Sequence, residues 1–207
     1  MTLFAELSQG TIILLVLAGI AVLLFFYFIA AYNGLVNLRN RFKNAFAQID
    51  VQLKRRYDLI PNLVETVKGA AAFEQSTLVA VTEARSKVGQ LSAGAAQNLA
   101  NDPAAFQKFQ EAQDGLSSAL SRLMVVVEKY PELKANQNFL NLQSQLESTE
   151  NGIANERRRF NEAAQTFNTK RQSFPTNIVA GFFGARFNEK PYFKAAEGSD
   201  KAPPVKF

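Results

Sequence analysis

The sequence predicts an all-α membrane protein in which one N-terminal transmembrane helix is followed by an antiparallel four-helix bundle. Two observations predict this class. Residues 11–31 form an apolar run of 21 residues without a charge. Beyond it, apolar residues recur at steps of three and four, the spacing of one helix face. We divide the chain into a short tail (1–10), a transmembrane helix (11–31), a bundle (32–174), an aromatic membrane-proximal segment (175–194) and a flexible tail (195–207).

The apolar run at residues 11–31 reads TIILLVLAGIAVLLFFYFIAA. As a helix it is about 30 Å long, the thickness of the hydrocarbon core of a bilayer. A secretory signal peptide is the alternative, but no Lys or Arg precedes the run and no A-x-A cleavage site follows it. The run therefore predicts a membrane anchor that the protein retains.

Charge is concentrated just after the anchor, where residues 32–60 hold six basic and two acidic side chains. Because Lys and Arg near a transmembrane helix stay on the cytoplasmic side, we expect a cytoplasmic bundle, an external N-terminus and a location in the cell (inner) membrane. Arg39, Arg41 and Lys43 are candidates for contact with anionic lipid headgroups. The alternative is a topology signal without lipid contact. No nucleic-acid-binding motif accompanies these residues, so we expect no nucleic-acid partner.

The first helix after the anchor is predicted from a stripe that runs from Leu35 to Ile60. Only Asn33 and Gly34 interrupt it, so the anchor is expected to continue directly into this helix, with Gly34 as a flexure. Proline disfavours helical geometry in the residue before it. The sequence therefore predicts a break at residues 58–61, followed by a second helix that runs through Gly69 to Leu91.

Residues 92–103 are small and polar and predict a loop. Asp102 followed by Pro103 predicts the start of a third helix, which we expect to end before Pro131. A fourth helix is predicted from about residue 132 to 174. Four of its apolar residues are spaced by seven, which favours a long left-handed packing seam: Ile153, Phe160, Phe167 and Phe174.

Two architectures fit these breaks, because Pro61 and Pro131 lie 36 and 34 residues from the loop centre at Gln97. If both prolines are corners, the chain forms a four-helix bundle. If both are kinks, it forms one long kinked helical hairpin. Short connections between amphipathic helices favour the bundle. Both architectures return the chain to the membrane near Phe174.

The returning segment holds three phenylalanines that we take as membrane-interface candidates, Phe182, Phe183 and Phe187, near Arg186 and Lys190. The alternative is that these rings close the open end of the bundle. The tail at residues 195–207 is polar and Pro-containing and is expected to be disordered without a partner.

The chain has no Cys, no His and no Trp. It therefore lacks thiolate nucleophiles, imidazole bases and the Glu-x-x-His pairs of di-iron bundles. The remaining carboxylate pairs, Glu111 with Asp114 and Glu147 with Glu150, have no neighbouring base and are expected to be solvated. We predict no enzymatic activity, no catalytic residues, no metal and no cofactor. A carboxylate-only enzyme is the weaker alternative.

The last predicted helix is rich in Asn and Gln. Burying an uncharged amide in an interface costs less than burying a charge. This predicts lateral self-association, with Asn141, Gln145, Asn155 and Gln165 as candidates. The consecutive Arg157, Arg158 and Arg159 point in different directions and are expected to form a solvated face.

Four stretches resemble the LemA family of membrane proteins: YNGLVNLRNRFKNAFAQIDVQLKRRYDLIPNLVETVKG at 32–69, TEARSKVGQL at 82–91, FLNLQSQLESTENGIANERRRFNEA at 139–163 and PYF at 191–193. The resemblance implies an N-terminal anchor, an antiparallel helical bundle and no catalytic residues to carry over. It says little about activity.

The functional prediction is a non-enzymatic single-pass membrane protein whose bundle acts as a self-assembling scaffold at the membrane surface. Membrane lipid and further copies of the chain are the expected partners. The alternative is an adaptor that binds one specific membrane or cytoplasmic protein, whose identity the sequence does not give.

Overall fold

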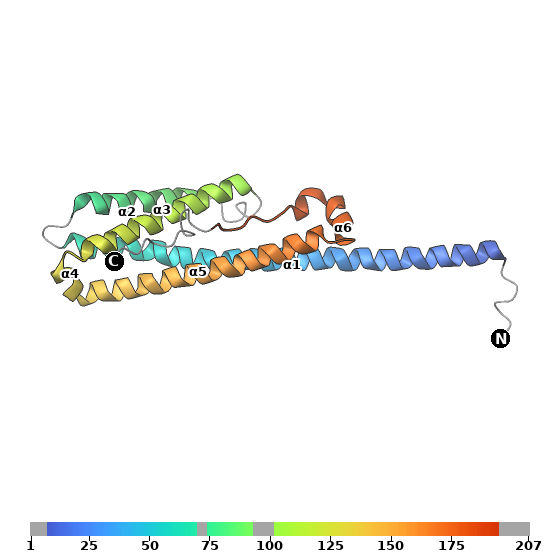
Figure 1. Cartoon of the computed structure of the whole chain (residues 1–207), viewed down its shortest axis with the longest axis horizontal. Coiled ribbons are helices and arrows are strands. Elements are labelled where there is room, and N and C mark those ends of the chain that lie inside the picture. The colour runs from blue at the N-terminus through green and yellow to red at the C-terminus, as the bar shows by residue number, and fades with distance from the viewer. Residues whose placement is uncertain (1–7, 70–73, 93–101, 195–207) are drawn as a thin grey trace, which may run out of the picture. The chain divides into compact units, whose positions relative to one another are not determined.

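The computed structural model describes residues 8–69, 74–92 and 102–194. All regular elements within these ranges are helices, which confirms the predicted all-α class (Figure 1). They are α1 (Gln9–Lys68), α2 (Gln75–Ser92), α3 (Pro103–Val127), α4 (Pro131–Ala135), α5 (Gln137–Gln172), α6 (Thr176–Phe182) and the 3-10 helix η2 (Gly184–Phe187). The predicted C-terminal tail, most of the N-terminal tail and most of the predicted loop at 92–103 lie outside the described residues.

The chain divides into two compact units, which we describe separately. The membrane-proximal unit comprises residues 1–41 and 166–189. The bundle unit comprises residues 42–165 and 190–207. Helices α1 and α5 each contribute to both units.

Helix α1 is continuous over 60 residues. As predicted, the apolar run continues without interruption through Gly34 into the following helix. The predicted break at residues 58–61 is wrong, because Pro61 lies inside α1. Ile60, Val64 and Val67 are buried on both sides of the proline. Burial of this apolar face offsets the helical hydrogen bond that proline cannot make.

The carbonyl that Pro61 leaves without a helical donor has another partner. In a regular helix the amide of residue 61 would donate to the Tyr57 carbonyl. Here the Nε of Arg85, on α2, donates to that oxygen at 3.2 Å. The Arg85 guanidinium also lies 3.8 Å from the centre of the Tyr57 ring. The side chain of α2 therefore replaces the missing backbone donor of α1, which explains how the proline is accommodated.

The turn expected at Pro61 occurs instead after Lys68, where Gly69 follows the end of α1. The predicted second helix is accordingly shorter and begins at Gln75. Pro131 is the first residue of the short helix α4. The two prolines thus have different roles, and the expectation that both are corners or both are kinks is wrong.

The core of the bundle unit takes residues from α1, α2, α3, α4 and α5, as expected of a bundle. One cluster extends from Ile60 and Val81 to Leu123, Leu133 and Phe139. A second cluster is largely aromatic. Its phenylalanines are Phe42, Phe46, Phe106, Phe109, Phe160 and Phe193. The antiparallel order of the helices stays a prediction.

The helix starts follow local capping. Asp102 Oδ1 accepts hydrogen bonds from the amides of Ala104 at 2.9 Å and Ala105 at 3.1 Å, which confirms the predicted start of α3. Asn136 Oδ1 accepts from the amides of Asn138 and Phe139. This second cap divides the predicted fourth helix into α4 and α5.

The predicted seam on α5 is partly correct. Ile153, Phe160 and Phe167 are buried, but Phe174 is 80% exposed. The seam ends because α5 itself ends at Gln172, two residues earlier.

In the membrane-proximal unit, a small core joins α1 to the returning chain. Its buried residues are Leu35, Phe167, Ala180 and Phe187. Gly184, the first residue of η2, has a φ of 49°, a conformation that favours glycine.

Candidate membrane-proximal site

The apolar side chains in the N-terminal part of α1 are exposed. Among the described residues, α1 is the one helix long and apolar enough to cross a membrane, and none of its most apolar 18-residue window is buried. Leu23 is 71% exposed, and Phe25 and Phe26 are similarly open. Such a surface requires an apolar environment, and a bilayer supplies one.

The returning chain packs against the C-terminal part of this apolar stretch. We call residues 174–187 the aromatic segment. The Tyr27 hydroxyl and Thr176 Oγ1 are 3.3 Å apart. The ring of Phe183 lies 5.9 Å from that of Phe28 and 4.7 Å from that of Tyr32. The segment therefore lies beside residues that the sequence assigns to the membrane anchor and its exit.

The three predicted interface phenylalanines have different environments. Phe182 is 79% exposed, Phe183 is half-buried and Phe187 is fully buried. Phe187 packs against Tyr32 and Phe167, with ring centres 5.7 and 6.5 Å apart. Phe182 presents its ring to the surroundings, whereas Phe187 holds the segment on α1.

Sequence reasoning missed two further exposed apolar residues. Phe174 and Ile178 are 80% and 62% exposed, and with Phe182 they form a set spaced by four residues. We call these three side chains the outer row. The spacing was visible in the sequence. Phe174 was predicted both as the end of the buried seam and as the point where the chain returns to the membrane, and its exposure shows that the first of these is wrong. A groove of about 540 Å³ lies between the segment and α1, lined by apolar residues that include Leu24, Phe28 and Val179.

Basic residues flank the uncharged stretch at residues 172–185, which includes most of the aromatic segment. Residues 172–185 carry no charge, and Arg171 and Arg186 flank them. Arg171 Nε donates to the carbonyl of Phe187 at 2.5 Å, which joins the two ends of the segment. The Arg186 guanidinium lies 5.5 Å from the centre of the Tyr32 ring. An uncharged apolar stretch between two cations is typical of a segment at a membrane interface.

The three basic residues predicted to contact lipid headgroups differ in their exposure and in the unit to which they belong. In the membrane-proximal unit, Arg41 is exposed and Arg39 is half-buried. Lys43 belongs to the bundle unit, where its side chain is exposed.

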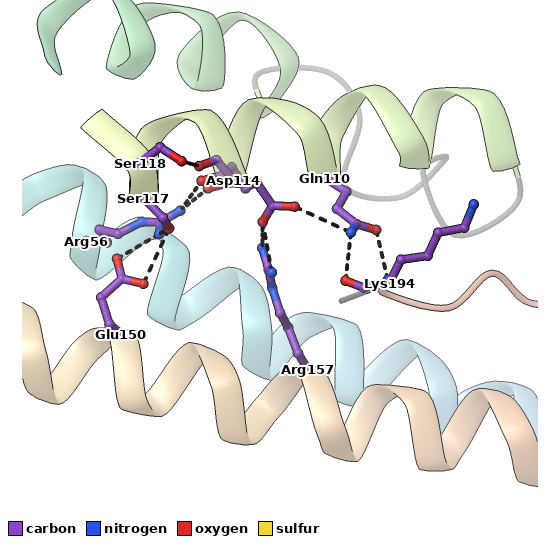
Figure 2. A network of polar contacts seen from close by, with 9 residues as sticks. Arg56, Gln110, Asp114, Ser117, Ser118, Glu150, Arg157 and Lys194 are labelled. Atoms are coloured by element: carbon purple, nitrogen blue, oxygen red, sulfur yellow. Dashed lines mark hydrogen bonds and ion pairs between the residues drawn. The ribbon is translucent and has the colours of Figure 1, made fainter. Parts of the chain in front are cut away.

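The bundle unit contains a buried cation that the sequence did not indicate. Arg56 is fully buried. Its Nη1 donates to Ser117 Oγ at 2.7 Å and to Glu150 Oε1 at 2.8 Å, and its Nη2 donates to the side chain of Gln113 (Figure 2). These groups come from α1, α3 and α5, so Arg56 ties three helices together. It occurs on the basic stretch that follows the anchor, where it was read as part of the charge asymmetry.

A second pair lies nearby in the same unit. Arg157 Nη1 and Nη2 both donate to Asp114 Oδ1 at 2.9 Å (Figure 2). The expectation of a solvated face holds for Arg158 and Arg159, which are exposed, and is wrong for Arg157. Asp114 and Glu150, predicted to be solvated, are engaged by these two arginines.

The charged groups of the network are therefore occupied in joining helices. Within the described residues, no group of three or more His, Cys, Asp or Glu side chains could hold a metal ion.

The predicted self-association residues Asn141, Gln145, Asn155 and Gln165 are all exposed on α5. Asn141 Oδ1 accepts a hydrogen bond from Gln137, and Asn155 Oδ1 accepts one from Arg158, both at 3.3 Å. These amides are thus placed where another molecule can reach them.

Comparison with known proteins gives several relatives. The chain is 28% identical to magnetosome protein MamQ of Magnetospirillum gryphiswaldense, over 77% of the chain and 65% of the relative. It is 28% identical to magnetosome protein MamQ 2 of Paramagnetospirillum magneticum, over 86% and 71%. It is 28% identical to protein LemA of Metamycoplasma hominis, over 75% and 66%. The chain thus spans about two thirds of the length of these relatives.

The family comparison covers most of the bundle and the returning segment. The model of the LemA family matches residues 45–207 of the chain. This match and the bare apolar helix that precedes it agree with the four stretches identified in the sequence: the chain is a membrane-associated member of the LemA family.

Proposed function

We propose that this protein is a non-enzymatic, single-pass membrane scaffold, anchored by residues 11–31 in the inner membrane. Its N-terminus is outside the cell membrane, and its bundle unit assembles with further copies on the cytoplasmic side. The observation that carries the proposal is the outer row, Phe174, Ile178 and Phe182, exposed in the same unit as the bare apolar helix.

The outer row supports a membrane position for energetic reasons. Burying one large apolar side chain stabilises a protein by roughly 1.5–3 kcal/mol relative to leaving it in water. Three such exposed side chains in one segment thus favour an apolar surrounding by several kcal/mol. Arg186, exposed and beside Tyr32, is suited to phosphate headgroups at the boundary.

A non-enzymatic role is supported by the use of charge in the bundle unit. The most buried cation, Arg56, and the half-buried Arg157 are paired with carboxylates and hold helices together. A catalytic site needs groups that change partners during a reaction. These pairs are instead fixed parts of the core.

The lipid contact is tested with tryptophan, because the natural chain has none. Ile178→Trp in the full-length protein is reconstituted in vesicles whose phospholipids carry bromine on their acyl chains. We expect its fluorescence to be quenched by the bromines. Val79→Trp, an exposed position on α2, is the matched control and should not be quenched. Equal emission in brominated and ordinary vesicles at Ile178→Trp would remove the lipid contact from the proposal.

The assembly is tested by mass. The full-length protein in mild detergent should be larger than one chain at micromolar concentration. A variant with Asn141→Glu, Gln145→Glu and Asn155→Glu should shift the distribution toward single chains, because charges are costly to bury in an interface. A wild-type protein that is monomeric under these conditions would contradict self-assembly.

A further inference from the structure

After η2, the chain lies against α3 and α5 of the bundle unit. We call residues 190–194 the C-terminal strap. They have no regular secondary structure, and they belong to the bundle unit although residues 166–189 before them belong to the membrane-proximal unit. The strap packs against α3 and α5 of the bundle unit, and its contacts divide into two kinds.

The first kind consists of hydrogen bonds from two side-chain amides to the backbone of the strap. Asn161 Nδ2 donates to the carbonyl of Phe193, and Asn161 Oδ1 accepts from the Phe193 amide, both at 2.9 Å. Gln110 Nε2 donates to the carbonyl of Lys194 at 2.9 Å, and Gln110 Oε1 accepts from the Lys194 amide at 3.1 Å (Figure 2). Each amide thus uses a donor and an acceptor on one residue, as a neighbouring strand would.

The second kind is an aromatic anchor. Phe193 is only 6% exposed. Its ring centre lies 4.7 Å from that of Phe106 and 5.1 Å from that of Phe160. The Arg157 guanidinium lies 4.8 Å from the centre of the Phe193 ring. A buried aromatic side chain on a backbone that two side-chain amides hold at consecutive residues is a peptide-recognition arrangement.

We propose that this surface of α3 and α5 is a peptide-binding site and that, in the assembled protein, it holds the strap of a second copy of the chain. The inference rests on the self-assembly proposed above and adds a second contact between copies to the amide face of α5. The site binds the backbone of the strap and one phenylalanine ring, and every copy of the chain carries this segment.

Exchange between copies conserves the contacts. The strap begins at the boundary between the two units, after the exposed residues Asn188 and Glu189. Through this connection the strap of one copy can bind to α3 and α5 of another copy with the same amide hydrogen bonds and the same ring contacts. Such an exchange of an identical element is domain swapping, which costs little because no contact is lost. Anchoring in one membrane raises the effective concentration of neighbouring straps.

The direct test uses the absence of cysteine in the natural chain. Full-length protein with Gln110→Cys is co-expressed with full-length protein carrying Lys194→Cys, and membranes are treated with a short bismaleimide. Asn161 and Phe193 remain to hold the strap. We expect a two-chain product containing one of each variant. A double variant that closes only within one chain, with no product between the two single variants, would overturn the exchange.

A second measurement guards against perturbation by cysteine. Phe193→Ala should shift the detergent-solubilised protein toward single chains, whereas Val125→Ala, at an exposed apolar position on α3, should keep the wild-type mass. Circular dichroism must show equal helix content in both. An unchanged mass for Phe193→Ala would overturn the proposal. A wild-type oligomer without crosslinks refutes only the exchange, whereas a wild-type monomer refutes the proposed assembly itself.

Discussion

The two units use apolar and charged side chains in opposite ways. In the membrane-proximal unit, Phe174 and Phe182 are about four-fifths exposed. In the bundle unit, Phe160 and the cation Arg56 are fully buried. The same helices, α1 and α5, contribute to both units. The difference teaches that packing against neighbouring elements, rather than residue type, decides which side chains are exposed: on α1 itself, Leu23 is 71% exposed and Phe42 is fully buried.

The largest expected effect separates buried from exposed phenylalanine. Phe160 packs with Phe42, Phe106 and Phe193 at ring distances of 4.6, 5.6 and 5.1 Å. Phe160→Ala leaves a cavity at this point and should lower the free energy of unfolding by about 3–5 kcal/mol. Phe182→Ala should change it by less than about 0.5 kcal/mol.

Urea unfolding of the full-length protein in detergent, followed by circular dichroism, measures both variants. Equal losses for Phe160→Ala and Phe182→Ala would show that the contrast between the units is not energetic.

The second effect concerns buried charge in the bundle unit. Arg56→Ala leaves Glu150 and Gln113 without their cation and should lower the free energy of unfolding by about 3 kcal/mol, the lower end for a broken buried pair, since the Glu150 side chain is 36% exposed. Arg56→Met should lose less, because its apolar chain refills part of the volume. The neighbouring exposed Arg55→Ala is the control and should be near neutral.

The same urea titration ranks these three variants. If Arg55→Ala costs as much as Arg56→Ala, general charge balance rather than the pairing at Glu150 accounts for the loss.

The smallest effect concerns the proline inside α1. Arg85→Ala removes the donor to the Tyr57 carbonyl and should cost about 1–2 kcal/mol of unfolding free energy. When Pro61→Ala is also present, the backbone amide of residue 61 can donate to that carbonyl, so Arg85→Ala should cost less. A double-mutant cycle of unfolding free energies measures this coupling. Additive costs would mean that Arg85 does not compensate for the proline.

Much of the fold could be predicted from local pattern. The anchor, its continuation into the next helix and the start of α3 at Asp102 follow from composition and capping and were predicted correctly. The break predicted at Pro61 was wrong, because the donor that compensates for the proline, Arg85, is 28 residues from the Tyr57 carbonyl to which it donates. Sequence rules weigh a proline against its neighbours and do not see a side chain from another helix.

The candidate site was less predictable. Phe182 was identified from its apolar, aromatic surroundings, whereas Phe174 was assigned to the wrong face because the spacing by seven continues beyond the end of α5. Arg56, Gln110 and Asn161 had no local signal. Each acquires its role from partners on other elements. Arg56 donates to Gln113, 57 residues later in the sequence, and Gln110 holds Lys194, 84 residues later. Asn161 meets the strap 32 residues later.

The Arg85 contact also bears on the order in which the chain forms during synthesis. Residues 57 and 61 leave the ribosome before residue 85 does, so at first only water can donate to the Tyr57 carbonyl. This carbonyl can gain its protein donor only when α2 is present and supplies the Arg85 guanidinium. The end of α1 and the whole of α2 should therefore become protected from hydrogen exchange together, as one cooperative element, after the anchor has already entered the membrane.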